Sequence, residues 1–160
     1  MKQLLLSVLM SCVFGMAVAE TPLPFVHGSM AEIKAGQAEK PMIVSFWSID
    51  CPPCYKELAM WRDLGERFPS MNLVLVSTDA LDAADEVNQV LKERGVERFP
   101  SWQFAEDHVQ RLRYEIDKRW YGELPRTYFY SPSGKSTAVS GVVEHDKIEQ
   151  WLAQYYPTKK

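Results

Sequence analysis

The sequence predicts an α/β fold in which a mixed central sheet carries helices on both faces. An apolar run, a helical segment and a second apolar run follow one another early in the chain, which indicates two parallel strands and a crossover helix. Later, two strand-like runs flank the turn sequence Ser131–Gly134, which indicates an antiparallel hairpin. The chain closes with apolar residues at helical spacing. Parallel and antiparallel pairing together predict a mixed sheet covered on both faces.

Each predicted element has its own local signal. Strands are expected where apolar and β-branched residues run together, and helices where apolar residues recur three and four apart. A capping box of Ser29 and Glu32 marks the start of the first helix, and Gly95 is placed to end the third. The predicted strands are Phe25–Val26, Met42–Trp47, Met71–Ser77, a strand or turn at Phe99–Phe104, Pro125–Tyr130 and Thr137–Val143; the predicted helices run over 30–38, 52–68, 81–93, 109–116 and 148–155.

Length and charge limit the organisation of the chain. With 160 residues, of which 46% are hydrophobic, the chain can form one compact domain with a real core, and we assign it residues 20–160. A net charge of -3 provides no basic surface for nucleic acid, so nucleic acid is not expected among its partners. We expect a monomer.

Residues 1–19 resemble a secretory signal peptide. Lys2 supplies the positive start, residues 4–18 form an apolar run, and Ala17-Val18-Ala19 resembles a cleavage site before Glu20. We therefore expect export to the periplasm. A retained membrane anchor is the weaker alternative, because the apolar run is shorter than the roughly 20 residues of a spanning helix.

Cysteine content favours a chemical role for one pair. Cys12 lies within the predicted signal, and the residues before it loosely resemble a lipoprotein cleavage box, so a lipid anchor at Cys12 is a second, less favoured alternative. Cleavage after Ala19 leaves only Cys51 and Cys54. A single disulfide closing so short a loop constrains the unfolded chain little, so it is not a structural scaffold.

The pair lies in Cys51-Pro52-Pro53-Cys54, at the start of a predicted helix that follows a buried strand. Cysteines three apart on a first helical turn can close a small disulfide, while the first sulfur stays at the positive end of the helix. Prolines fit this turn, where their missing N–H groups would have no intrahelical partner. We assign Cys51 as the nucleophile and Cys54 as the resolving thiol.

Three motifs together resemble the thioredoxin superfamily. Phe46-Trp47-Ser-Ile-Asp-Cys51-Pro-Pro-Cys54 resembles F-W-x-x-x-C-x-P-C, Glu57 matches an acidic position three residues later, and Leu124-Pro125-Arg-Thr-Tyr-Phe resembles the P-x-T-F strand. Within the superfamily, the chain is similar to exported TlpA-like and ResA-like thiol-disulfide oxidoreductases, which include cytochrome c maturation reductases. The resemblance covers Phe25 to Tyr156 and implies a thioredoxin-like fold with a redox-active disulfide and no other cofactor or metal.

The resemblance implies roles for two further residues. Pro125 would be a cis-proline that faces the disulfide and turns the backbone of Leu124 toward a client peptide. Without C-P-P-C, an ordinary trans proline would be the simpler reading. Glu57 would move a proton to or from Cys54, the work that thioredoxin gives to a buried Asp at the position of Ser45 here. Alternatively, Glu57 is a water-exposed carboxylate on the first helical turn.

Two departures from the family pattern bear on the thiolate of Cys51. Asp50 stands where the family usually has Trp, and its like charge disfavours the thiolate. Arg126 could oppose that charge if it reaches the site, or it could simply be solvated. No histidine lies between the cysteines to stabilise the thiolate, as a strongly oxidising pair requires. We therefore expect a reductase.

In the mechanism we expect, Cys51 attacks a client disulfide and Cys54 then resolves the mixed disulfide. Partners would be client protein disulfides and a membrane or exported thiol that donates electrons. An apolar docking lip of Trp47, Pro52 and Leu124, with Phe46, would hold the client, and Arg126 is a further expected client-binding residue. Phe46 on a buried strand is also a core candidate.

Other functions remain as alternatives. A thiol oxidase or isomerase of the same fold is the nearest, and a peroxidase is another. Paired thiolates also suit Cu(I), which makes a metallochaperone an alternative from a different class. It would need a further soft ligand, and His27, His108 and His145 have no ligand spacing to the cysteines. Structural zinc is disfavoured because four ligands are lacking.

Overall fold

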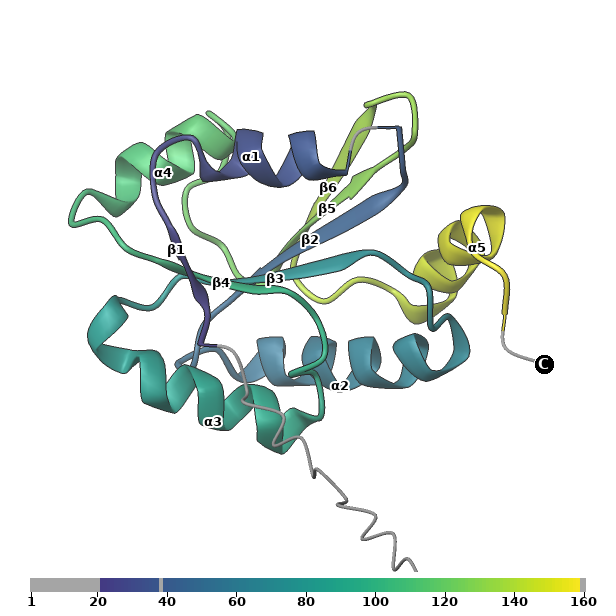
Figure 1. Ribbon diagram of the computed structural model, residues 1–160, viewed down its shortest axis with the longest axis horizontal. Coiled ribbons are helices and arrows are strands. Elements are labelled where there is room, and N and C mark those ends of the chain that lie inside the picture. The colour runs from purple at the N-terminus through teal and green to yellow at the C-terminus, as the bar shows by residue number, and fades with distance from the viewer. Residues whose placement is uncertain (1–20, 38, 159–160) are drawn as a thin grey trace, which may run out of the picture.

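The computed structural model describes residues 21–37 and 39–158, and Figure 1 shows a central sheet flanked by helices. The predicted signal at 1–19, with Cys12, lies outside the described residues. In the described part, no helix combines the length and the apolar character needed to cross a bilayer.

Elements alternate along the chain much as predicted. The strands are β1 (Leu23–Phe25), β2 (Met42–Trp47), β3 (Leu73–Ser77), β4 (Ser101–Phe104), β5 (Arg126–Tyr130) and β6 (Ser136–Ser140). The helices are α1 (Ser29–Gly36), α2 (Pro52–Arg67), α3 (Ala84–Arg94), α4 (Val109–Ile116) and α5 (His145–Tyr155), with a 3-10 turn η1 (Leu81–Ala83) before α3.

The six strands form one mixed sheet in the order β1-β4-β3-β2-β5-β6. Strands β1, β4, β3 and β2 pair in parallel, whereas β5 is antiparallel to both β2 and β6. Strand β2 is therefore central, and all six of its residues are buried. The predicted parallel pair, hairpin and mixed sheet are confirmed.

Two hydrophobic clusters pack on opposite faces of this sheet. Along β2, Ile43 and Trp47 join one cluster with residues of α2, α3 and α5, while Val44 and Phe46 join the other with residues of α1 and α4. The alternation follows from the period of two along a strand. Figure 1 shows α1 and α4 on one side of the sheet and α2 and α3 on the other, so the prediction of helices on both faces is confirmed.

Helix α1 begins differently from the prediction. Ser29 is its first helical residue, and its hydroxyl accepts a hydrogen bond from the Val26 N–H at 2.9 Å instead of capping the helix. Gly28 occupies the N-cap with a φ of 88°, a conformation that glycine adopts without steric cost. The predicted capping box is therefore wrong, because Ser29 already lies inside the helix.

Strand boundaries also move by a few residues. Strand β1 covers Leu23–Phe25, so Val26 falls outside it, and β6 ends at Ser140, before the predicted limit of Val143. The backbone N–H of Gly141 instead donates to the Pro125 carbonyl, and that of Val143 donates to the Glu57 carboxylate. This difference matters because those partners belong to the candidate site.

Candidate active site

Cys51 and Cys54 form a disulfide at the start of α2, as their spacing predicts. Cys51 is the N-cap residue, and Pro52 and Pro53 occupy the first two helical positions. The Cys54 N–H donates to the Cys51 carbonyl at 2.9 Å, which closes the first turn. Cys51 is 7% exposed and Cys54 is fully buried. Cys51 is therefore the more accessible of the two cysteines, and both are largely buried.

Pro125 lies at the same end of the sheet as the disulfide. Strand β5 begins at Arg126, which pairs with Phe46 one residue before the end of β2, so Pro125 extends beyond that pair toward the turn that leads to Cys51. The Leu124–Pro125 peptide bond is cis. Leu124 is half-buried and packs against the cluster that contains both cysteines. The Gly141 N–H donates to the Pro125 carbonyl at 2.8 Å, which ties this turn to the loop after β6.

Glu57 is buried in the core, one turn along α2 from Cys54, with only 1% of its surface exposed. Its Oε1 accepts hydrogen bonds from the hydroxyls of Ser45 at 3.1 Å and Thr127 at 2.5 Å, and its Oε2 accepts one from the Val143 N–H at 3.4 Å. A separation of three residues places Glu57 and Cys54 on one face of the helix. The alternative of a water-exposed first-turn carboxylate is therefore wrong.

Burial is the main influence on the acidity of Glu57. Desolvation raises the pKa of its carboxyl above the ordinary value of 4.5, and the hydrogen bonds from Thr127, Ser45 and Val143 act in the opposite direction. A buried carboxyl whose pKa lies above its usual range can exchange a proton closer to neutral pH. Glu57 is thus a buried carboxyl with a raised pKa, one helical turn from Cys54.

Thr127 and Val143 were missed in the sequence analysis. The P-x-T-F motif contains Thr127 and was the available signal, whereas the place of Thr127 opposite Ser45 follows from the pairing of β5 with β2. Val143 contributes through its backbone, which leaves no trace in side-chain patterns. Three elements thus supply donors to one carboxylate: β2, β5 and the loop after β6.

Arg126 does not approach Asp50. Its guanidinium donates to Asp117 at 2.8 Å, to the Ser140 hydroxyl at 2.7 Å and to the Tyr128 hydroxyl at 3.2 Å. Neighbouring strand residues point to opposite faces, so Thr127 faces α2 and Arg126 faces away from it. Neither alternative for Arg126 holds: its guanidinium pairs with Asp117 instead of Asp50, and its side chain is only 12% exposed, so it is not simply solvated. Its expected part in client binding stays a prediction. Asp50 itself is exposed.

Only some residues of the predicted docking lip are exposed enough to contact a client. Trp47 is 1% exposed and lies in the core beside both cysteines, so its side chain is not available to a client. Phe46 is fully buried, which confirms its core alternative. Pro52 is exposed and Leu124 is half-buried, so both remain candidates. Val142, which the sequence analysis missed, is 42% exposed beside the Gly141 that binds Pro125.

No metal centre is apparent in the described part of the chain, where no group of three or more His, Cys, Asp or Glu side chains is placed to hold an ion. His27 pairs with Glu115 at 2.5 Å, His108 precedes α4, and His145 begins α5 near Glu149. The three histidines therefore stand on separate elements.

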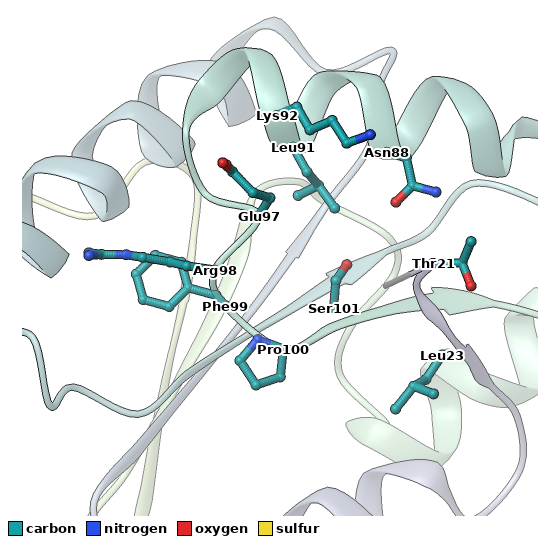
Figure 2. A pocket seen from close by; sticks show the side chains of 10 residues that line it. All are labelled: Thr21, Leu23, Asn88, Leu91, Lys92, Glu97, Arg98, Phe99, Pro100 and Ser101. Atoms are coloured by element: carbon teal, nitrogen blue, oxygen red, sulfur yellow. The ribbon is translucent and has the colours of Figure 1, made fainter. Parts of the chain in front are cut away.

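A cavity of about 210 Å³ lies elsewhere, between α3 and the start of β4 (Figure 2). Lys92 and Asn88 project from α3 above it, and the Ser101 hydroxyl is directed toward that helix. None of its lining residues belongs to the disulfide turn, to the Leu124–Pro125 turn or to the Glu57 cluster. The cavity is therefore separate from the disulfide.

One sequence relative and several solved structures resemble this chain. No family model matches the chain. Thioredoxin H4 of Arabidopsis thaliana is 32% identical over 71 residues, which span 44% of this chain and only 56% of that relative's length. A secreted Mycobacterium tuberculosis disulfide oxidoreductase homologous to E. coli DsbE superposes with a TM-score of 0.60 at 21% identity, covering 75% of this chain and 85% of its own.

Two further solved structures have the same architecture. A thioredoxin-family thiol:disulfide interchange protein from Chlorobium tepidum gives a TM-score of 0.62 at 18% identity, covering 76% of this chain and 83% of its own. StoA from Bacillus subtilis gives 0.53 at 21% identity, covering 71% and 83%. The chain therefore has the thioredoxin fold, in agreement with the resemblance seen in its motifs, and the first two of these structural neighbours are described as a disulfide oxidoreductase and a thiol:disulfide interchange protein.

Proposed function

We propose that the protein is a thiol-disulfide oxidoreductase that reduces disulfides in client proteins outside the cytosol. The observation that carries this proposal is the Cys51–Cys54 disulfide at the start of α2, with Cys51 slightly exposed, Cys54 fully buried, and the buried Glu57 carboxyl one turn further along the helix. The likeness to solved disulfide oxidoreductases supports it.

The reaction balances as an exchange of two electrons and two protons. The Cys51 thiolate attacks one sulfur of a client disulfide, and the other client sulfur leaves as a thiolate that takes up a proton. Cys54 then loses its proton and attacks Cys51, which releases the second client sulfur as a thiol. The client gains two electrons, the enzyme keeps a Cys51–Cys54 disulfide, and an exported or membrane thiol donor must restore the dithiol.

Glu57 serves the second half of this cycle. Cys54 is fully buried and must become a thiolate before it can attack, so it needs a proton acceptor inside the protein. Glu57 shares its helix face and is held by Ser45 and Thr127. Its raised pKa makes its carboxylate a stronger proton acceptor than an ordinary one, which suits removal of the Cys54 proton.

Several features favour reduction in the periplasm. No histidine lies between the cysteines, and the residue before Cys51 is the exposed Asp50, so the thiolate lacks the strong stabilisation of oxidising pairs. Residues 1–19 resemble a secretory signal, and one structural relative is described as secreted. Because the motifs resemble the cytochrome c maturation reductases, an apocytochrome disulfide is one client that the proposal covers.

Variants of the two cysteines test the proposal. Cys51→Ser should lose turnover of insulin or a disulfide peptide, whereas Cys54→Ser should accumulate a mixed disulfide with the client. Retained turnover in Cys51→Ser would remove the proposal. The reduction potential of the Cys51–Cys54 pair then decides whether the protein reduces or oxidises its clients. A value near the roughly -120 mV of strong oxidants would favour the oxidase alternative.

Localisation has a separate test. Sequencing the N-terminus of the protein recovered from a periplasmic fraction should find Glu20 first. A modified Cys12 at the N-terminus would instead identify the lipid-anchored alternative.

A further inference from the structure

The turn that connects β2 to Cys51 is held by one side chain from a neighbouring loop. Asp79 follows β3, and its Oδ1 accepts a hydrogen bond from the Ser48 hydroxyl at 2.7 Å. Its Oδ2 accepts from the Ile49 N–H at 3.0 Å. Both oxygens of one carboxylate are therefore engaged with residues 48–49, immediately before the nucleophile.

Asp79 is itself fixed from its own side. The Ser77 hydroxyl donates to Asp79 Oδ2 at 2.7 Å, and the Asp79 N–H donates back to the same hydroxyl oxygen at 3.0 Å. Ser77 is fully buried on β3, where it pairs with Trp47 at the end of β2. The carboxylate is therefore a rigid part of the sheet's end and not a mobile surface group.

The hydrogen bonds continue from this carboxylate to Cys51. Ser48 Oγ accepts from the Asp50 N–H at 3.2 Å, and the Ser48 carbonyl accepts from the Cys51 N–H at 3.2 Å. Ser48 thus contacts Asp79 through its hydroxyl and Cys51 through its carbonyl. A shift of Ser48 would move the Cys51 backbone relative to the start of α2, where the helix dipole favours a thiolate.

We infer that Asp79 is a positioning residue for Cys51. By fixing Ser48 and Ile49, it holds the nucleophilic sulfur at the amino end of α2 and so sets its reactivity toward disulfides. The role is separable from folding, because the Thr78 N–H already joins the two strand ends through the Trp47 carbonyl at 2.9 Å. The inference rests on the proposed function but concerns the reactivity of one thiol, which can be measured without a client.

Two substitutions of Asp79 separate the effect of its hydrogen bonds on the position of Cys51 from the effect of its negative charge. Asp79→Asn removes the charge yet keeps the shape: its oxygen can accept from Ile49 and Ser77, and its amide can donate to Ser48 Oγ. Asp79→Ala removes both charge and contacts. Loss of a nearby negative charge alone would favour the Cys51 thiolate in both variants, whereas loss of position would disfavour it only in the alanine variant.

The measurement is the rate of iodoacetamide alkylation of Cys51 against pH, in the reduced Cys54→Ser protein so that only one of the two thiols reacts. Asp79→Ala should react about fivefold or more slowly than Asp79→Asn at neutral pH, with its midpoint at higher pH. Asp79→Asn should match or exceed the parent. Asp82→Asn, which removes an exposed charge from the same connection, is the control and should leave the profile unchanged.

Equal profiles for the alanine and asparagine variants would overturn the inference, because charge alone would then explain any effect. If Asp79→Ala fails to fold, Ser48→Ala decides: slower alkylation with the parent's melting temperature supports the positioning role, and the parent's rate contradicts it. Alkylation needs no client protein, so an altered profile in a protein that reduces no disulfide would refute the proposed function and leave this inference standing.

Discussion

The hydroxyl of Ser45 on β2 donates a hydrogen bond to the Glu57 carboxylate on α2 over 3.1 Å. The strand position that holds an acid in thioredoxin here holds a donor, and the acid stands on the adjoining helix. Thr127 donates from the next strand, so a single buried carboxyl is surrounded by hydroxyl donors of β2 and β5. The effect of these donors on the pKa of Glu57 can be tested.

Replacing Glu57 with Gln should change how stability depends on pH. Because desolvation raises the pKa of Glu57, the folded protein holds this proton more tightly than the unfolded chain. As pH rises above the ordinary 4.5, the unfolded chain ionises first, so stability falls until pH passes the folded pKa. Glu57→Gln should lack this fall in denaturant titrations at a series of pH values. Glu66→Gln, on the exposed face of α2, is the control and should keep it.

Replacing Thr127 with Val should raise the pKa of Glu57 further. The variant removes a hydroxyl that donates to the carboxylate at 2.5 Å and therefore removes stabilisation of its charged form. We expect a loss of about 1–3 kcal/mol at pH values where Glu57 is ionised. A carbon-13 NMR titration of the Glu57 carboxyl measures the midpoint. Thr127→Ser retains the donor, and a midpoint as high as that of the valine variant would contradict this account.

Removing Asp117 should destabilise the turn before Pro125. Its carboxylate pairs with Arg126 at 2.8 Å, and the two side chains are only 14% and 12% exposed. Asp117→Ala leaves the guanidinium without its counter-ion and should cost about 1–3 kcal/mol in chemical denaturation. The Arg119 N–H and Arg126 lower the pKa of Asp117, so its contribution is complete at neutral pH and is lost as pH falls below 3.8.

A double variant, Asp117→Ala with Arg126→Leu, should recover part of that loss, because no unpaired charge remains. The exposed Arg62–Asp63 pair provides a comparison, and Asp63→Ala should change stability little. Equal losses at the two sites would mean that the Asp117 pair contributes no more than a surface contact.

Changing Val142 to Ser should weaken client binding without altering the thiol chemistry. Val142 is 42% exposed and adjoins the Gly141 whose N–H binds the Pro125 carbonyl, so it borders the place where the proposed client lies. We expect KM for a protein substrate to rise roughly 3- to 10-fold. The rate with a small disulfide such as oxidised glutathione should stay unchanged. Val26→Ser, at a similarly exposed valine next to β1, should affect neither value.

Local sequence patterns were sufficient to predict the turn that carries Cys51 and Cys54. The run from Met42 to Trp47, the C-P-P-C spacing and the prolines all act within a few residues, and the structure places a buried strand, a turn and a helix there. The hairpin is equally local, since turn residues separate two pairing strands. These features could be predicted because their causes lie close together in the sequence.

The remaining features depend on contacts between distant segments. Glu57 and Thr127 are seventy residues apart along the chain, and whether Glu57 contacts Thr127 or water depends on how β5 pairs with β2. The direction of Arg126 depends on the same register, because a shift of one residue would exchange its face with that of Thr127. The sequence around Asp79 did not indicate its contacts with Ser48 and Ile49, because an acidic residue after a strand is common in loops.

The length and composition of strand β1 affect how its edge of the sheet can pair with other chains. It forms one margin of the sheet, is only three residues long and has Pro24 at its centre, which has no N–H to offer. Another polypeptide finds too few backbone donors there to prolong the sheet. This edge of the sheet therefore resists templated aggregation.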